Sequence, residues 1–229
     1  MQENTLDSEE IEPKPKPEPS NDIHKGSWLK SIVKNGKWYL IASLATKGML
    51  FFLLPVYTHY LTPSEYGIFN TLLSIAQLLP IFISFSLDAA FGRFFHDYKN
   101  DKEKLSQLFS SVYWFVASVG LVMLILVLSS SFLWIEKVAE VPAYPYAFLA
   151  FLPPLFLQLG TLGIIFLKQS LQSKLTSIVE VLGTIINIAI TLPLLIVWDL
   201  NIIARLWGYI GAAGFIYLFM TIYFIRKGI

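Results

Sequence analysis

Six runs of about 20 predominantly apolar residues, separated by short polar connections, constrain this chain more than any other feature. A bilayer core of about 30 Å is crossed by about 20 residues of α-helix, whereas helices of soluble domains average about three turns. The pattern therefore predicts an all-α, polytopic membrane protein with six transmembrane helices. The runs lie at 38–57, 67–87, 108–133, 146–167, 175–198 and 206–225.

Composition excludes several other classes of protein. Only 14% of the 229 residues are charged, against about 25% in soluble domains. A net charge of +1 does not suit a nucleic-acid partner, which needs a concentrated basic face. There is no cysteine and the three histidines are scattered, so neither a disulfide nor a metal site is indicated. No catalytic motif is present, and we expect neither an enzyme nor a cofactor.

The amino-terminal residues differ from the rest. Residues 1–27 are acidic, contain almost nothing apolar, and place a proline at every second position from Pro13 to Pro19. Alternating prolines cannot form a helix, so we expect a disordered cytoplasmic tail. Residues 28–37, with Trp28 and Lys30, are expected to form an interfacial helix. Residues 38–229 are then the six-helix transmembrane lobe.

Lysine and arginine predict the orientation of the spans. Basic residues gather on cytoplasmic flanks, and with the amino terminus inside the opposite side holds only Lys137 and Arg205. Both termini are therefore predicted to be cytoplasmic. The fourteen basic residues on that side are Lys14, Lys16, Lys25, Lys30, Lys34, Lys37, Arg93, Lys99, Lys102, Lys104, Lys168, Lys174, Arg226 and Lys227.

The few polar residues within the spans form stripes. An α-helix turns by about 100° per residue. On this spacing the polar residues of the second span fall within an arc of about 80° of the helix circumference, and so do the polar residues of the fifth span. Three polar residues of the first span share one face. The stripes are Asn70, Ser74, Gln77, Ser84 and Asp88 on the second span, Ser173, Ser177, Glu180, Thr184, Asn187 and Thr191 on the fifth, and Ser43, Thr46 and Lys47 on the first.

Two explanations of the stripes stay open. The hydroxyl and amide groups either join helices by hydrogen bonds or line a water-accessible cavity. Lys47 favours the cavity, since a lysine at the bilayer centre costs about 2.5–3.5 kcal/mol even on lenient scales. It needs water, an anionic ligand or an acidic partner such as Glu180. The candidate substrate-binding residues are Lys47, Asn70, Gln77, Glu180 and Asn187.

Two further features are structural or functional candidates. Asp88 and Arg93 lie at the predicted cytoplasmic end of the second span, where they either help to end a helix at the interface or act as a gate or ligand contact. In the sixth span, Gly208, Gly211, Ala212 and Gly214 give a small-residue surface suited to close helix packing.

Two motifs carry a family resemblance. The stretch Leu54-Pro55-Val56-Tyr57-Thr58-His59-Tyr60-Leu61-Thr62-Pro63-Ser64-Glu65-Tyr66-Gly67-Ile68-Phe69 resembles a signature of the polysaccharide-biosynthesis flippases. These form the O-antigen branch of the superfamily that also holds multidrug and toxin extruders. Ala90-Phe91-Gly92-Arg93-Phe94-Phe95 is similar to a second element of that family. The resemblance extends over about residues 28–227 and corresponds to the amino-terminal lobe of a two-lobe exporter.

The resemblance implies a transporter of the bacterial cytoplasmic (inner) membrane. Such proteins flip undecaprenyl-pyrophosphate-linked oligosaccharide between leaflets for surface polysaccharide biosynthesis. Partners would be membrane lipid, this glycan, and a missing carboxy-terminal lobe or a second copy, because family members usually have a second lobe and the chain stops after the sixth span. Alternatives are efflux of small amphipathic molecules, with Glu180 or Asp88 as a proton-linked acid, and a non-transporting scaffold for glycan assembly.

Overall fold

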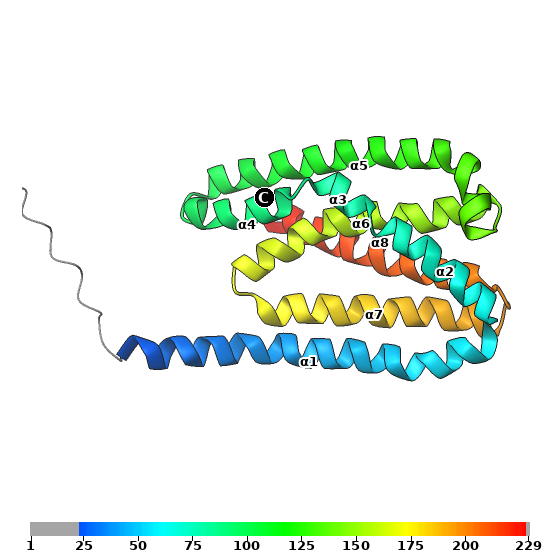
Figure 1. Ribbon diagram of the computed structural model, residues 1–229. Coiled ribbons are helices and arrows are strands. Elements are labelled where there is room, and N and C mark those ends of the chain that lie inside the picture. The colour runs from blue at the N-terminus through cyan, green and yellow to red at the C-terminus, as the bar shows by residue number, and fades with distance from the viewer. Residues whose placement is uncertain (1–22, 228–229) are drawn as a thin grey trace, which may run out of the picture. The chain divides into compact units, whose positions relative to one another are not determined.

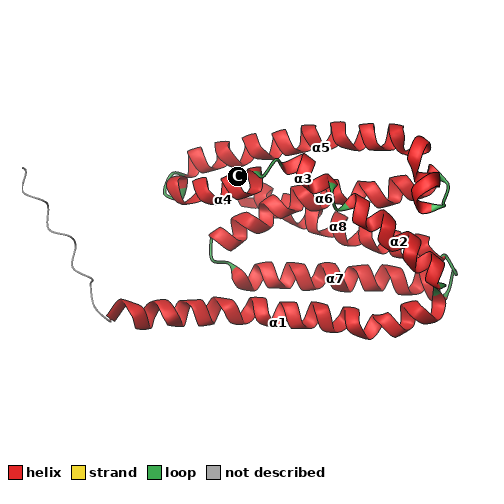
Figure 2. Ribbon diagram, viewed as in Figure 1, coloured by secondary structure: helices red, strands yellow, loops and turns green. Residues whose placement is uncertain are grey.

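A computed structural model describes the backbone of residues 23–227 and the side chains of residues 36–227. In this part of the chain every element is helical and the connections are short (Figures 1 and 2). The helices are α1 (Ile23–Tyr60), α2 (Pro63–Ala76), α3 (Leu79–Ser84), α4 (Leu87–Tyr98), α5 (Lys102–Ala139), α6 (Ala143–Gln169), α7 (Ser173–Ile196) and α8 (Asn201–Lys227).

The six predicted spans and the all-α class are confirmed. Six helical segments are long and apolar enough to cross a bilayer, and the third of them, α5, reaches 38 residues. The connections α1–α2, α5–α6 and α7–α8 lie together at one end, which is the predicted outer side (Figure 1). The connections α4–α5 and α6–α7 lie at the other end, the predicted cytoplasmic side. The orientation itself stays a prediction.

The chain divides into two units, residues 1–34 and residues 35–229. Of the predicted tail, residues 1–22 lie outside the described residues. Helix α1 begins at Ile23, within the last residues predicted as tail, and runs without a break through the predicted interfacial helix 28–37. That segment therefore has no boundary of its own, and its position at the membrane surface stays a prediction. The cavities and contacts described below lie in the second unit.

The centre of that unit is α6. In its most apolar stretch 61% of the residues are buried, against 11–33% in the other five spans. Helices α2 to α5 and α8 pack around it, and α7 packs mainly on α8. Most of the described side chains of α1 are exposed, and Leu53 and Tyr57 near its end join Leu61, Leu195 and Ala204 in a small core. Exposed leucine and phenylalanine side chains on a spanning helix suit contact with lipid.

The second predicted span is broken into three helices. Pro80 has no N–H to donate, and the chain changes from α2 to α3 at Gln77–Leu78. Phe85 and Ser86 then adopt left-handed backbone angles, with φ of 45° and 61°, before α4 begins. The periodicity of a single helix therefore does not extend past Gln77.

The predicted stripe on this span is accordingly only partly correct. Asn70 and Ser74 on α2 and Gln77 at its C-cap are all exposed, as one face of one helix requires. Ser84 is buried on α3 and Asp88 lies in the first turn of α4, so these two residues do not continue that face. The error comes from treating 67–87 as one straight helix.

Helix α2 begins with a capping box. The Glu65 backbone N–H donates to Thr62 Oγ1 at 3.3 Å, and the Thr62 backbone N–H donates to Glu65 Oε2 at 2.8 Å. Pro63 occupies the first turn, where its missing N–H costs nothing. The Leu-Thr-Pro-Ser-Glu part of the first motif is thus a helix-start signal.

We expect Thr62→Ala to lower the free energy of unfolding by about 1 kcal/mol, the usual cost of losing an N-cap side chain. Thermal unfolding of the purified protein in detergent measures this. Thr58→Ala is the matched control, since Thr58 Oγ1 only donates to the carbonyl of Pro55 within α1. Equal melting temperatures for the two variants would contradict a stabilising N-cap role of the Thr62 side chain.

Helix α5 begins with a second cap. The Lys104 backbone N–H donates to Asp101 Oδ1 at 3.1 Å, and the Lys104 ammonium lies 3.4 Å from Asp101 Oδ2. The backbone hydrogen bond is the main cause that lowers the pKa of Asp101 below its ordinary value of 3.8. Because the folded-state pKa is depressed, this cap stabilises the helix above that ordinary value and is lost as the pH falls through the lower one.

The small residues of α8 produce a close crossing with α7, as predicted for two of them. A Cβ atom on Gly208 would overlap Thr191 Oγ1 and lie 2.8 Å from the Asn187 carbonyl oxygen, and one on Gly211 would overlap the Ile190 side chain. Gly214 has open space around it, so it does not take part. Ala212 lies on the wall of a cavity.

Candidate functional site

A cavity of about 380 Å³ lies between α1, α2, α7 and α8. We call it the α7–α8 cavity. Part of its wall is apolar and part carries polar or charged groups, which is the usual make-up of a ligand site. The apolar residues are Leu50, Phe69, Leu73, Ala212 and Ile216, and the polar residues are Tyr57, Glu180, Thr184, Asn187, Arg205 and Tyr209.

The middle of the predicted α7 stripe faces this cavity. Glu180, Thr184 and Asn187 are half-buried on its wall. Thr184 Oγ1 donates to the Glu180 carbonyl at 3.2 Å, and the Asn187 amide has no hydrogen-bond partner among the described residues. The stripe's ends, Ser173 and Thr191, are buried instead.

Glu180 is paired with a residue that the sequence did not suggest. Its Oε1 lies 3.1 Å from the Nζ of Lys168, near the end of α6. The ion pair between Glu180 and Lys47, one of the alternatives left open by the sequence, is therefore not formed. Lys47 is exposed on α1 and pairs with no carboxylate in the described part of the chain.

Arg205 is the most unusual residue of the α7–α8 cavity. Its guanidinium carbon lies 3.8 Å from the ring centre of Phe69, 4.3 Å from that of Tyr57 and 5.1 Å from that of Tyr66, all within cation–π range. Its Nη1 is buried without a hydrogen-bond partner. Among residues 36–227 no carboxylate forms an ion pair with it, so the groups that face its charge there are these three aromatic residues.

The first motif supplies this aromatic cage. Tyr57 lies near the end of α1, and Tyr66 and Phe69 lie in the first two turns of α2. The capping box fixes where α2 begins, so residues before and after the turn converge on one guanidinium from α8. Arg205 was not predicted as a site residue, because in the sequence it stands out only as one of two basic groups on the predicted outer side. An arginine at the start of an apolar span was the available signal.

Other predicted binding residues do not line the α7–α8 cavity. Asn70 and Gln77 are exposed on α2, next to the lining residues Phe69 and Leu73. Lys47 lies one turn before the lining residue Leu50 on α1. These three side chains are exposed and are not part of the described cavity wall.

Asp88 and Arg93 border a different space. A wide groove of about 440 Å³ lies between α4 and the end of α6, near the predicted cytoplasmic side. The two residues share this groove with His96, whose Nε2 lies 3.0 Å from Gln169 Oε1. Asp88 and Arg93 form no ion pair with each other in the described structure, so they do not end a helix as a bonded pair.

Comparison with known proteins identifies the family. Residues 32–228 match the family model described as polysaccharide biosynthesis protein, a match that includes all of the cavity-lining residues. The chain belongs to the polysaccharide biosynthesis protein family. Neither a curated protein nor a solved structure showed a significant match. Six candidate spans make this family member a multi-pass membrane protein, and transporters of this family are generally not enzymes.

Proposed function

We propose that this polysaccharide biosynthesis protein flips a lipid-linked oligosaccharide across the bacterial cytoplasmic membrane. The cargo would be an undecaprenyl-pyrophosphate-linked glycan, and the α7–α8 cavity would form part of its path. The observation that carries the proposal is Arg205, a cation with no counter-ion among the described residues, whose Nη1 is buried and unbonded at the wall of this cavity.

An anionic ligand would complete the Arg205 environment. An unpaired hydrogen-bond donor in a buried site costs about 1–3 kcal/mol, and more when it is charged. A phosphate oxygen is a strong acceptor for a guanidinium and often binds it through two hydrogen bonds. The amide of Asn187 and the hydroxyls of Thr184 and Tyr209 stand on the same wall and suit sugar hydroxyls.

The exposed polar residues of α1 and α2 extend this polar surface. Lys47, Asn70 and Gln77 would be costly against lipid, and they lie beside the lining residues Leu50, Phe69 and Leu73 of the cavity. We assign them to a wet surface that borders the substrate path. Asp88 and Arg93, in their separate groove, would then contact the cargo or gate its entry from the predicted cytoplasmic side.

Efflux of small amphipathic molecules has less support. It requires an acid in the transport path that is free to bind a proton. Glu180, the acidic residue in the described lining of the α7–α8 cavity, is paired with Lys168, and Asp88, the other candidate acid, borders a separate groove. The non-transporting scaffold leaves the unpaired Arg205 without a role.

Deleting the gene distinguishes these functions. The flippase predicts loss of surface polysaccharide and accumulation of lipid-linked oligosaccharide in the cytoplasmic leaflet, with unchanged drug sensitivity. Drug sensitivity with normal surface polysaccharide would favour efflux. Purified protein in vesicles must then move a fluorescent polyprenyl-pyrophosphate glycan between leaflets. If the purified protein moved no glycan in this assay, the non-transporting scaffold would be the remaining function.

Chromosomal Lys47→Ala is expected to reduce polysaccharide export about tenfold or more, since a charge-assisted hydrogen bond contributes about 1.5–3 kcal/mol. Membrane insertion should persist, because Lys47 is exposed and packs against little. Lys47→Arg should keep most of the export. Surface polysaccharide is measured against membrane protein level, and full export by Lys47→Ala would remove this residue from the path.

A further inference from the structure

A basic pocket lies at the predicted cytoplasmic side, away from the α7–α8 cavity. Its volume is about 440 Å³. Three lysines surround it: Lys99, just after α4, Lys102, at the start of α5, and Lys227, at the end of α8. Its remaining wall is mainly apolar, formed by Phe95, Leu105 and Phe166. A cationic rim over an apolar floor suits a ligand that is anionic at one end.

In the described part of the chain, no carboxylate forms an ion pair with the three lysines of this basic pocket. Neighbouring acids have other partners, since Asp101 pairs with Lys104 and Glu103 Oε1 accepts a hydrogen bond from Gln107 at 3.4 Å. Asp97 is exposed, and in the described structure it forms no ion pair with any of the three lysines. Lys227 instead lies 4.8 Å from the ring centre of Tyr223. The ammonium groups are therefore available to a phosphate.

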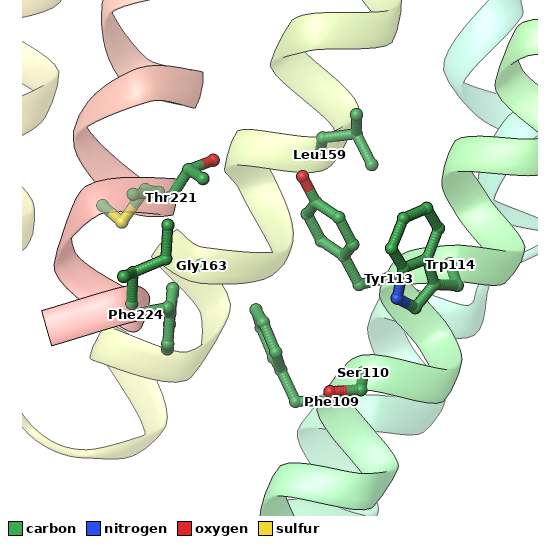
Figure 3. Close-up of a pocket in the computed structure, with 10 residues that line it drawn as sticks. Phe109, Ser110, Tyr113, Trp114, Leu159, Gly163, Thr221 and Phe224 are labelled. Atoms are coloured by element: carbon green, nitrogen blue, oxygen red, sulfur yellow. The ribbon is translucent and has the colours of Figure 1, made fainter. Parts of the chain in front are cut away.

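A second, apolar space lies deeper between α5, α6 and α8. Figure 3 shows Phe109 and Tyr113 extending from α5 toward Gly163 of α6 and Phe224 of α8. We call this space, of about 150 Å³, the aromatic crevice. At its edge, Trp114 and Ile225 are 69% and 72% exposed. Large apolar side chains exposed on spanning helices face lipid, so the crevice opens to the hydrocarbon.

The pocket and the crevice follow one another along the same two helices. From Lys102 to Phe109 is seven residues of α5, about 10 Å, and from Lys227 to Thr221 is six residues of α8, about 9 Å. Between them stand stacked rings, with Phe109 and Phe224 centres 4.4 Å apart. A phosphate at the lysines would therefore place an attached chain at the mouth of the crevice.

We propose that the basic pocket and the aromatic crevice together bind one anionic glycerophospholipid of the predicted cytoplasmic leaflet. The phosphate lies among Lys99, Lys102 and Lys227, and the first part of one acyl chain enters the crevice. Basic pockets between spanning helices hold lipid headgroups in this way. The site contacts α4, α5, α6 and α8, so a bound lipid would connect the central helix α6 with three of the helices that pack around it.

Lipid binding to the purified full chain tests this, by native mass spectrometry with phosphatidylglycerol, phosphatidylcholine and a polyprenyl phosphate. A lysine near an anionic headgroup contributes about fivefold in affinity. Replacing Lys99, Lys102 and Lys227 with glutamine should therefore weaken phosphatidylglycerol binding at least tenfold. Replacing them with arginine should preserve it. The matched control is glutamine at Lys37, Lys137 and Lys174, none of which lines the basic pocket.

The crevice has its own test. Ser110→Trp fills it and should also weaken phosphatidylglycerol binding, whereas Ser129→Trp, at an exposed position farther along α5, should not. The wild-type affinity for phosphatidylglycerol should fall as salt screens the lysines. Equal binding of phosphatidylcholine, or competition by inorganic phosphate alone at the same concentration, would overturn the proposal. A stronger preference for the polyprenyl phosphate would reassign the site to the carrier lipid.

Discussion

Replacing Arg205 with methionine is expected to reduce polysaccharide export by about 10- to 150-fold, the equivalent of a charged hydrogen bond of about 1.5–3 kcal/mol. The Arg205 guanidinium is a cation on the wall of the α7–α8 cavity, and its Nη1 has no hydrogen-bond partner among the described residues. Methionine has a similar length and an apolar surface, so it fills the cage of Tyr57, Tyr66 and Phe69 and removes the charge together with its hydrogen-bond donors. Export is measured as surface polysaccharide per unit of membrane protein.

The stability of the same variant separates ligand binding from packing. A buried charge without a counter-ion contributes little to folding, and its replacement by an apolar side chain is often neutral or stabilising. Arg205→Met should therefore keep or raise the melting temperature. If the arginine only joined α8 to α1 and α2 through its aromatic contacts, the melting temperature would fall and export would fall only with protein level.

Two further variants test whether the charge alone is sufficient and whether the position of the basic residue matters. Arg205→Lys keeps the charge but loses the planar, two-pronged donor, so export should lie between those of the wild type and methionine. Lys137→Met removes the other basic residue of the predicted outer side, which is exposed at the end of α5, and should leave export unchanged. Normal export by Arg205→Met would end the assignment of an anionic ligand to this residue.

Element length and apolar periodicity were sufficient to predict the fold. Spanning helices must satisfy their own backbone in lipid, so a run of about 20 apolar residues leaves few alternatives. The failure at α2, α3 and α4 has a local cause. Pro80 signalled one interruption, but the left-handed residues Phe85 and Ser86 carry no glycine to announce the second. Polar positions beyond the break were therefore assigned to the wrong face.

The candidate site was predictable only where it depends on one helix. Glu180 and Asn187 were found because a stripe with helical spacing needs no tertiary information. The partner of Glu180 is Lys168, on another helix, and no pattern along the chain relates the two. Arg205 is similar, because its cage forms only when the ends of α1, α2 and α8 meet. The first motif marked the cage residues without indicating what they surround.

Gly208→Leu is the substitution that we expect to destabilise the described unit most. The Cβ atom alone would overlap Thr191 Oγ1 and lie 2.8 Å from the Asn187 carbonyl oxygen. A backbone atom cannot rotate away, so α7 and α8 must separate. Overpacking typically costs about 1–3 kcal/mol, and we expect at least the upper end of this range. Thermal unfolding in detergent measures the loss.

Gly214→Leu is the matched control on the same helix, because a Cβ atom there has no neighbour within 4 Å. Both changes give the same gain in helix propensity, so their difference isolates the crossing of α7 and α8. Asn187 lines the α7–α8 cavity, so Gly208→Leu should also reduce export beyond its effect on protein level. Equal stability of the two variants would mean that α7 and α8 do not cross at Gly208, and the cavity between them would then have a different shape.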